Sequence, residues 1–261
     1  AVHSTRTRHS TWRAACCSLG LMATGMLLLE APAQAQSLGA AQTFSVLGGS
    51  TVTNTGPTIL IGDLGVSPGS AIVGFPPGSV TGTIYTGLDG PGVAAHADTI
   101  TAYNSIAGMA ANTILTGQDL GGMTLTPGVY KFDTSAQLTG SLFLDAMGDS
   151  NAAFHFQIGS TLTTADFSSV SVVGGLQLAN VFWQVGTSAT LGFGTAFLGN
   201  ILADASITLT TGAGISDGRA LAINGGVTLD SNNINNGGLV GAPLGINGTY
   251  WKGGINNLWS A

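Results

Sequence analysis

The sequence predicts a mostly β fold, a right-handed parallel β-solenoid with one long α-helix packed alongside it. Three observations predict this fold: the composition, a set of internal repeats and a single helical segment. The chain has 261 residues, 41 of them Gly, and its short runs of branched residues are separated by Gly or Asn. Such a composition is typical of many short strands joined by tight turns. Its plentiful, regularly spaced apolar residues argue against disorder.

Internal repeats indicate stacked coils. The sequence GNILA at 199–203 returns as GRALA at 218–222, nineteen residues later. SATL at 188–191 returns as SITL at 206–209 after eighteen residues, and as GVTL at 226–229 after twenty more. FQIG at 156–159 returns as WQVG at 183–186 after twenty-seven. Periods near twenty predict a solenoid in which each coil pairs only with its neighbours. Its parallel strands should be joined with right-handed connections.

One segment departs from the repeats and predicts a helix over residues 91–111. Its small and apolar residues recur every three or four positions: Val93, Ala97, Ile100, Tyr103, Ala107 and Ala110. That spacing is typical of an amphipathic helix, and Pro91 suits its first turn. We expect the helix to cover one face of the solenoid. A mobile lid over an active site is the alternative, which the small apolar stripe makes less favourable.

The N-terminal residues 1–35 are typical of a secretory signal peptide. Three Arg residues precede an apolar run at 14–29, and two Ala-x-Ala frames end at Ala35. An N-terminal membrane anchor is the alternative, but the run is short and interrupted by Gly. We expect export to the medium or a periplasm, a main domain at 36–240 and a C-terminal extension at 241–261. That extension holds Tyr250, Trp251 and Trp259, and it should cap or wrap the last coil.

Cleavage after Ala35 would leave three basic residues, eleven Asp and no Cys or Glu. So few cations argue strongly against a partner that presents many phosphates, such as nucleic acid, and also against anionic lipid. No disulfide is possible in such a mature chain. We expect a monomer that binds neither nucleic acid nor, after cleavage, a membrane.

Few residues could perform catalysis. After residue 35 the only histidines are His96 and His155, and no spacing typical of a zinc site occurs. The Asp residues stand mostly at turns, where their side chains bond local backbone, and a Ca²⁺ role is the less favoured alternative. We therefore expect no enzyme activity, no metal and no cofactor.

Hydroxyl groups are abundant and regularly placed. In the three repeats Leu should point inward, so the alternating Thr190, Thr208 and Thr228 should point outward in one file. Ser188 and Ser206 should form a second file beside it, which continues to residue 226. Adjacent coils lie ~4.8 Å apart, so the result is a regular, uncharged array. Thr also favours strands on ordinary solvated faces, and this explanation stays open beside a functional surface.

Several stretches resemble the ice-binding proteins of the large microbial ice-binding-like family. They are TNTGPT (53–58), GDLGVSPG (62–69), LTPGVY (125–130), FQIGSTL (156–162), NVFWQVG (180–186), GNILA (199–203) and GRALA (218–222). The resemblance implies a solenoid of triangular section, made discontinuous by an N-terminal segment that inserts between later coils. It also implies cold adaptation, adsorption to the surface of an ice crystal through one flat face, and inhibition of ice growth and recrystallisation.

Many members of that family carry Thr-Ala/Gly-x-Thr/Asn on this face, which TGPT at 55–58 matches and the later repeats match only loosely. The expected ice contacts are Ser188, Thr190, Ser206, Thr208 and Thr228, followed by Thr53, Thr55 and Thr58. The rival interpretation is an extracellular adhesin-like solenoid that binds carbohydrate or another surface without ice activity. Aromatic residues of the C-terminal extension could stack on sugars, which favours the rival.

Overall fold

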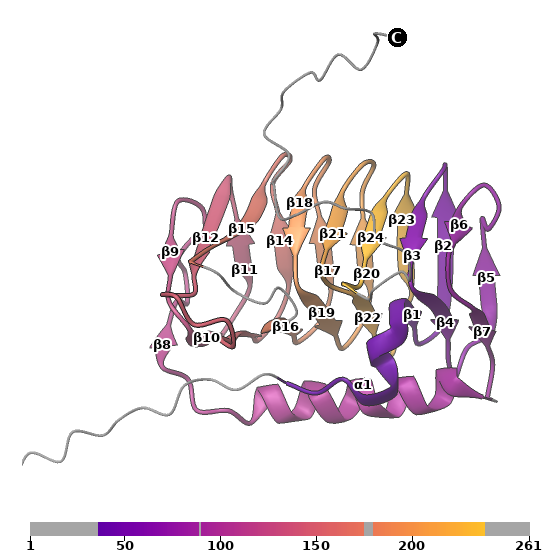
Figure 1. Cartoon of the computed structure of the whole chain (residues 1–261), viewed down its shortest axis with the longest axis horizontal. Helices are drawn as coiled ribbons and strands as arrows, with labels where there is room; N and C mark the ends of the chain where they lie inside the picture. The colour runs from indigo at the N-terminus through magenta and orange to yellow at the C-terminus, as the bar shows by residue number, and fades with distance from the viewer. Residues whose placement is uncertain (1–35, 89, 175–179, 238–261) are drawn as a thin grey trace, which may run out of the picture. The chain divides into compact units, whose positions relative to one another are not determined.

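The computed structural model describes residues 36–88, 90–174 and 180–237, which form three parallel β-sheets and one long helix (Figure 1). The predicted signal peptide (1–35) and C-terminal extension (241–261) lie outside these described residues. Consecutive strands of one coil, such as β13, β14 and β15, belong to three different sheets. Each coil therefore has three sides, and the predicted parallel solenoid is confirmed.

The three sheets run along the solenoid, and each contains one strand from successive coils in the following spatial order. Sheet A contains β7 (Ile84–Thr86), β4 (Asp63–Val66), β1 (Phe44–Gly48), β22 (Ala220–Ala222), β19 (Asn200–Ala203), β16 (Val181–Val185), β13 (Phe154–Ile158), β10 (Gly128–Phe132) and β8 (Thr113–Ile114). Sheet B contains β11 (Ala136–Leu138), β14 (Leu162–Thr164), β17 (Ala189–Leu191), β20 (Ile207–Leu209), β23 (Val227–Asp230), β2 (Thr51–Thr55) and β5 (Ala71–Val73). Sheet C contains β6 (Ser79–Val80), β3 (Ile59–Ile61), β24 (Asn233–Asn235), β21 (Gly214–Ser216), β18 (Ala196–Leu198), β15 (Ser169–Val173), β12 (Ser141–Asp145) and β9 (Thr124–Leu125).

The coils do not follow one another in sequence order throughout. Strands β1, β2 and β3 of the first coil pair with β22, β23 and β24 of the last described coil. Figure 1 shows the indigo N-terminal strands beside the yellow C-terminal ones. We call this contact between coil β1–β3 and coil β22–β24 the joint. The discontinuous solenoid that the resemblance implies is therefore present.

The core inside the coils is a stack of apolar side chains contributed by all three sheets. Leu191, Leu209 and Leu229 are buried beneath sheet B, as the alternation predicts. Each such side chain contributes roughly 1.5–3 kcal/mol by leaving water. The rings of Phe156 and Trp183 stack with their centroids 3.8 Å apart, and the indole nitrogen donates to the Leu198 carbonyl at 3.0 Å.

Sheet A is covered on its outer face by α1 (Pro91–Ala107) and the short 3-10 helix η1 (Gly39–Thr43). Strands β1, β13 and β16 are consequently buried at every position. Burial on both sides explains their nearly continuous apolar sequences. The outer faces of sheets B and C have no such cover in the described residues and carry exposed side chains.

The helix differs from its prediction in length and in the face it buries. It ends at Ala107 rather than 111, because Gly108 caps it and donates its N–H to the Asn104 carbonyl at 3.1 Å. Its buried residues are Gly92, Ala95, Thr99, Ala102 and Ile106. The predicted stripe is wrong: Val93 is 38% exposed, and Ala97 and Ala107 are exposed. Most of these buried residues are small, so the helix backbone can lie close to sheet A. The face of the helix that is buried is therefore the one with small side chains, not the one with the largest apolar side chains.

Candidate functional site

No group of three or more His, Cys, Asp or Glu residues that could hold a metal occurs within the described ranges. No helix in that part of the chain is long and apolar enough to cross a membrane. The outer faces of sheets B and C, which no helix covers in the described residues, carry exposed side chains.

The outer face of sheet B carries an unbroken line of threonines, which we call the threonine row. Its members come from five adjacent strands and are, in spatial order, Thr163, Thr190, Thr208, Thr228 and Thr53. Each is the direct partner of the next across the parallel strand pairs. Their side chains are exposed or half-buried. Because adjacent strands lie ~4.8 Å apart, methyl and hydroxyl groups repeat at this interval along the row.

Two other side chains terminate the threonine row. Gln137 on β11 pairs with Thr163 at one end, and Val73 on β5 pairs with Thr53 at the other. Val73 is 59% exposed. The row thus has an apolar end and an amide end, with hydroxyl-bearing residues between them.

A second row lies two residues earlier in each coil, toward the corner with sheet A. It includes the predicted Ser188 and Ser206, and both side chains are half-buried. The Ser188 hydroxyl accepts a hydrogen bond from the Ser206 amide, and the Ser206 hydroxyl accepts one from the Gly226 amide, both at 3.3 Å. These serines therefore bond the backbone of the next coil as well as bordering the threonine row.

The opposite border of the threonine row contains Thr55, which is exposed and pairs with Asp230. The Thr55 hydroxyl donates to the Leu229 carbonyl at 3.3 Å. Asp230 is the one charged residue in the seven strands of sheet B, and its carboxylate accepts a hydrogen bond from the Thr211 hydroxyl. Apart from this border position, the strands of sheet B present no charge.

Thr58 does not lie on this face, so its prediction as a surface contact is wrong. Its side chain is fully buried at the corner between sheets B and C. The preceding Gly56 has a φ of 80°, a left-handed conformation that ends the strand and turns the chain. Thr58 stands three residues after Thr55, so a period of two does not place the two side chains on one face. Beyond the turn the Thr58 hydroxyl points inward and donates to Asn54 Oδ1 at 2.5 Å.

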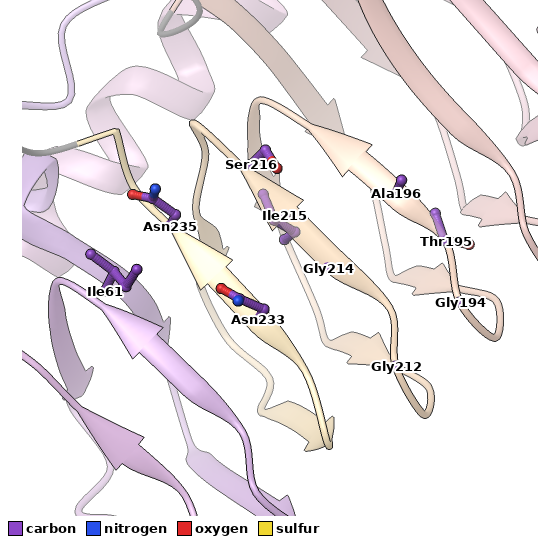
Figure 2. A pocket seen from close by; sticks show the side chains of 10 residues that line it. All are labelled: Ile61, Gly194, Thr195, Ala196, Gly212, Gly214, Ile215, Ser216, Asn233 and Asn235. Carbon is purple, nitrogen blue, oxygen red and sulfur yellow. The ribbon is translucent and has the colours of Figure 1, made fainter. Parts of the chain in front are cut away.

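The outer face of sheet C is different in character. Strands β18, β21, β24 and β3 form a broad depression of about 410 Å³. Figure 2 shows Asn235 on β24 near Ser216 on β21, and Asn233 beside Gly214. Its lining contains no aromatic side chain and no charged one. This depression lacks the stacking surface on which a sugar ring usually rests.

His155 faces outward from sheet A but is completely buried. Its ring stacks on Phe182, with centroids 5.5 Å apart and planes 10° apart, and neither ring nitrogen has a hydrogen-bond partner. Burial lowers its pKa to about 4. His155 is therefore a neutral, buried side chain. It has no access to solvent through which it could exchange protons with a substrate.

Thr163 is the member of the threonine row that the sequence interpretation missed. The coil containing β13 and β14 is longer than those that follow, so it falls outside the repeats near twenty. The offset of twenty-seven residues between Phe156 and Trp183 carries the signal, because subtracting it from Thr190 gives Thr163. The pairing of Phe156 with Trp183 and of Thr163 with Thr190 confirms that offset.

Comparison with known proteins identifies close relatives. A protein-family model described as Ice-binding-like matches residues 46–235. An ice-binding protein of Nostoc sp. (strain HG1) is 58% identical over 219 residues, 84% of this chain and 81% of that protein. The crystal structure of an ice-binding protein from an Antarctic biological consortium matches with a TM-score of 0.76 and 44% identity, over 79% of this chain and 93% of that one. The structure of an ice-binding protein from an Arctic yeast, described as giving the structural basis for its antifreeze activity, matches with a TM-score of 0.71 and 32% identity. The match covers 77% of this chain and 94% of that one.

Proposed function

The chain belongs to the ice-binding-like family, and from this premise we propose that it adsorbs to ice through the outer face of sheet B. The threonine row is the observation that carries this proposal. It places a β-branched residue with one methyl and one hydroxyl on each of five adjacent strands, at the regular spacing of a parallel sheet. No charged side chain interrupts the row.

The physical basis is the match between a rigid array and an ordered water lattice. Hydroxyls can hold water at fixed positions, while the methyl groups between them favour an ordered, ice-like layer. Each contact is weak, but the strands fix the array before binding, so little conformational entropy is lost on adsorption. Ice growing between adsorbed molecules must then bulge, and the curvature lowers its local freezing point. Inhibition of ice growth and recrystallisation follows.

The residues we assign to ice contact follow from their placement. Thr190, Thr208 and Thr228 lie at the centre of the face, with Ser188 and Ser206 along one border. Thr163 and Thr53 extend the row at its two ends, and Thr55 lies on the other border. Thr58 is omitted because it is buried.

The same proposal covers the setting in which the protein acts. We propose that residues 1–35 direct export, and that the mature protein works outside the producing cell, or in a periplasm, as a monomer. Adsorption requires no catalytic step, and no enzyme activity is assigned. The last described coil offers no free edge for the predicted extension at 241–261 to cap, because β22, β23 and β24 each pair with a strand on both sides.

Ice-affinity partitioning tests this function against the carbohydrate-binding rival. A fluorescently labelled protein is mixed with growing polycrystalline ice, and the fraction frozen into the ice is compared with that of labelled albumin. We expect strong enrichment in the ice. Equal distribution of the two proteins, together with retention on a polysaccharide column, would instead support the rival.

A further inference from the structure

The joint is the one place in the described solenoid where neighbouring coils are not consecutive in the chain. The threonine row crosses it between Thr228 and Thr53, which are direct partners on β23 and β2. Elsewhere in sheet B each row position and the next are linked by a single coil of chain. At the joint, the alignment of the row depends on noncovalent contacts between the N-terminal and C-terminal coils.

A buried hydrogen-bond relay crosses the joint at the corner between sheets B and C. The Thr58 hydroxyl accepts a hydrogen bond from the backbone N–H of Asn232 at 3.0 Å and donates one to Asn54 Oδ1 at 2.5 Å. Asn232 belongs to the C-terminal coil, whereas Thr58 and Asn54 belong to the N-terminal one. All three side chains are at most 5% exposed. Thr58 therefore connects the two coils through a single hydroxyl.

The relay extends one coil further on each side. The Asn232 side-chain amide donates to the carbonyls of Thr210 and Ala213, at 2.9 and 2.8 Å, in the preceding coil. The Asn54 side-chain amide donates to the Gly74 carbonyl at 2.8 Å in the following one. Side-chain hydrogen bonds thus join four successive coils along the edge of sheet B. A buried network of this kind fixes position, because each unmade bond would leave a desolvated polar group.

We propose that Thr58 is a positioning residue for the ice-contact face, holding Thr53 in line with Thr228. Asn54, which accepts the Thr58 hydrogen bond, stands directly between Thr53 and Thr55 on β2. A displacement at Thr58 therefore reaches the outward side chains through one residue. The proposal rests on the proposed function and adds to it: Thr58 never touches ice, yet the regularity of the row across the joint depends on its hydroxyl.

The test compares Thr58→Val, which keeps the β-branched shape and removes the hydroxyl, with Thr58→Ser, which keeps the hydroxyl. The matched control is Thr99→Val, since Thr99 is also fully buried but bonds the Ala95 carbonyl inside α1. All variants are assayed near 0 °C after circular dichroism has established that they are folded. We expect Thr58→Val to lose recrystallisation inhibition several-fold, while Thr58→Ser and Thr99→Val retain it. Amide exchange at Thr53 should become roughly tenfold faster in Thr58→Val, as expected for loss of a buried hydrogen bond.

Thr208→Tyr separates failure of this inference from failure of the proposed function. If Thr208→Tyr abolishes ice activity but folded Thr58→Val keeps full activity, the positioning role is wrong and the face is right. If Thr208→Tyr changes nothing, the assigned face itself is wrong. Should Thr58→Val not fold, Asn54→Ser decides, because it shortens the acceptor of the same hydroxyl; full activity in that variant would overturn the inference.

Discussion

The hydroxyl of Thr53 donates a hydrogen bond to the hydroxyl of Thr228, 175 residues away in the sequence, with 3.4 Å between the two oxygens. The two side chains come from opposite ends of the described chain and stand side by side on sheet B. Their contact makes one continuous face from two segments of sequence. The size of the proposed ice-contact surface therefore depends on docking of the N-terminal coils.

Replacing the central Thr208 should abolish ice activity without unfolding the protein. A Tyr ring at this position would project above the row and keep neighbouring threonines from the ice lattice. Thr208→Tyr should change the free energy of unfolding by no more than about 0.5 kcal/mol, as is usual for surface substitutions. Thermal hysteresis and urea denaturation measure the two effects. The matched control is Ser216→Tyr on β21, which is exposed on sheet C of the same coil; its activity should stay normal.

Extending the threonine row should increase activity. Val73 occupies the next position after Thr53 and is 59% exposed. Val73→Thr keeps the branched shape and adds a hydroxyl in register with the row, so recrystallisation inhibition should occur at a lower protein concentration. The comparison is Ile84→Thr on β7 of sheet A, an exposed position away from sheet B. An equal gain in both variants would show that added polarity, rather than the row, is responsible.

The outcome at individual residues shows what the sequence can predict. Alternation with Leu placed Thr190, Thr208 and Thr228 correctly, because a strand carries its side-chain period along its whole length. The prediction of Thr58 came instead from the family motif at 55–58, and it failed because Gly56 turns the chain between Thr55 and Thr58. In the helix, residues 92–106 bury small side chains whose weak hydrophobicity left no clear stripe to detect. Contacts across the joint could not be predicted from periodicity, because their partners belong to distant parts of the sequence.

His155 should make the protein less stable in acid. Its pKa is lowered by burial from 6.5 to about 4, so between these values the unfolded chain binds a proton that the folded chain does not. Stability should therefore decrease as the pH falls from about 6.5 to 4, by about 3 kcal/mol at 1.36 kcal/mol per pH unit. Urea denaturation at pH 7 and pH 4.5 measures this. His155→Leu should flatten the dependence.

His96 provides the control for this pH experiment. Its ring nitrogen bonds the Ile223 carbonyl at 2.8 Å, and the residue is only partly buried. His96→Leu leaves His155 in place and should keep the steep loss of stability in acid. A steep dependence that survives in His155→Leu would assign the effect to another group.

Arg219 should stabilise the packing of η1 against sheet A without affecting the ice-contact face. Its buried guanidinium donates twice to the Gln42 carbonyl, at 3.1 and 2.6 Å, and once to Asn200 Oδ1 at 2.7 Å. Arg219→Met removes these bonds and should lower the free energy of unfolding by about 2–4 kcal/mol. Because Arg219 lies beside sheet A, ice activity per folded molecule should be unchanged. A variant with normal stability and reduced ice activity would contradict both expectations.

The coil order has a consequence for how the protein folds during synthesis. A ribosome that has completed β2 at Thr55 has made one side of the joint, but its partner β23 ends only at Asp230. Until then β2 has β5 as a neighbour on one side and an unsatisfied edge on the other. Closing so long a loop is slow, because contacts between distant residues must wait for the chain to find them. The nascent chain is therefore most prone to aggregation just before its last coil, β22–β24, has been synthesised. A chain that terminates before β23 would lack Thr228, and its threonine row would be interrupted at the joint.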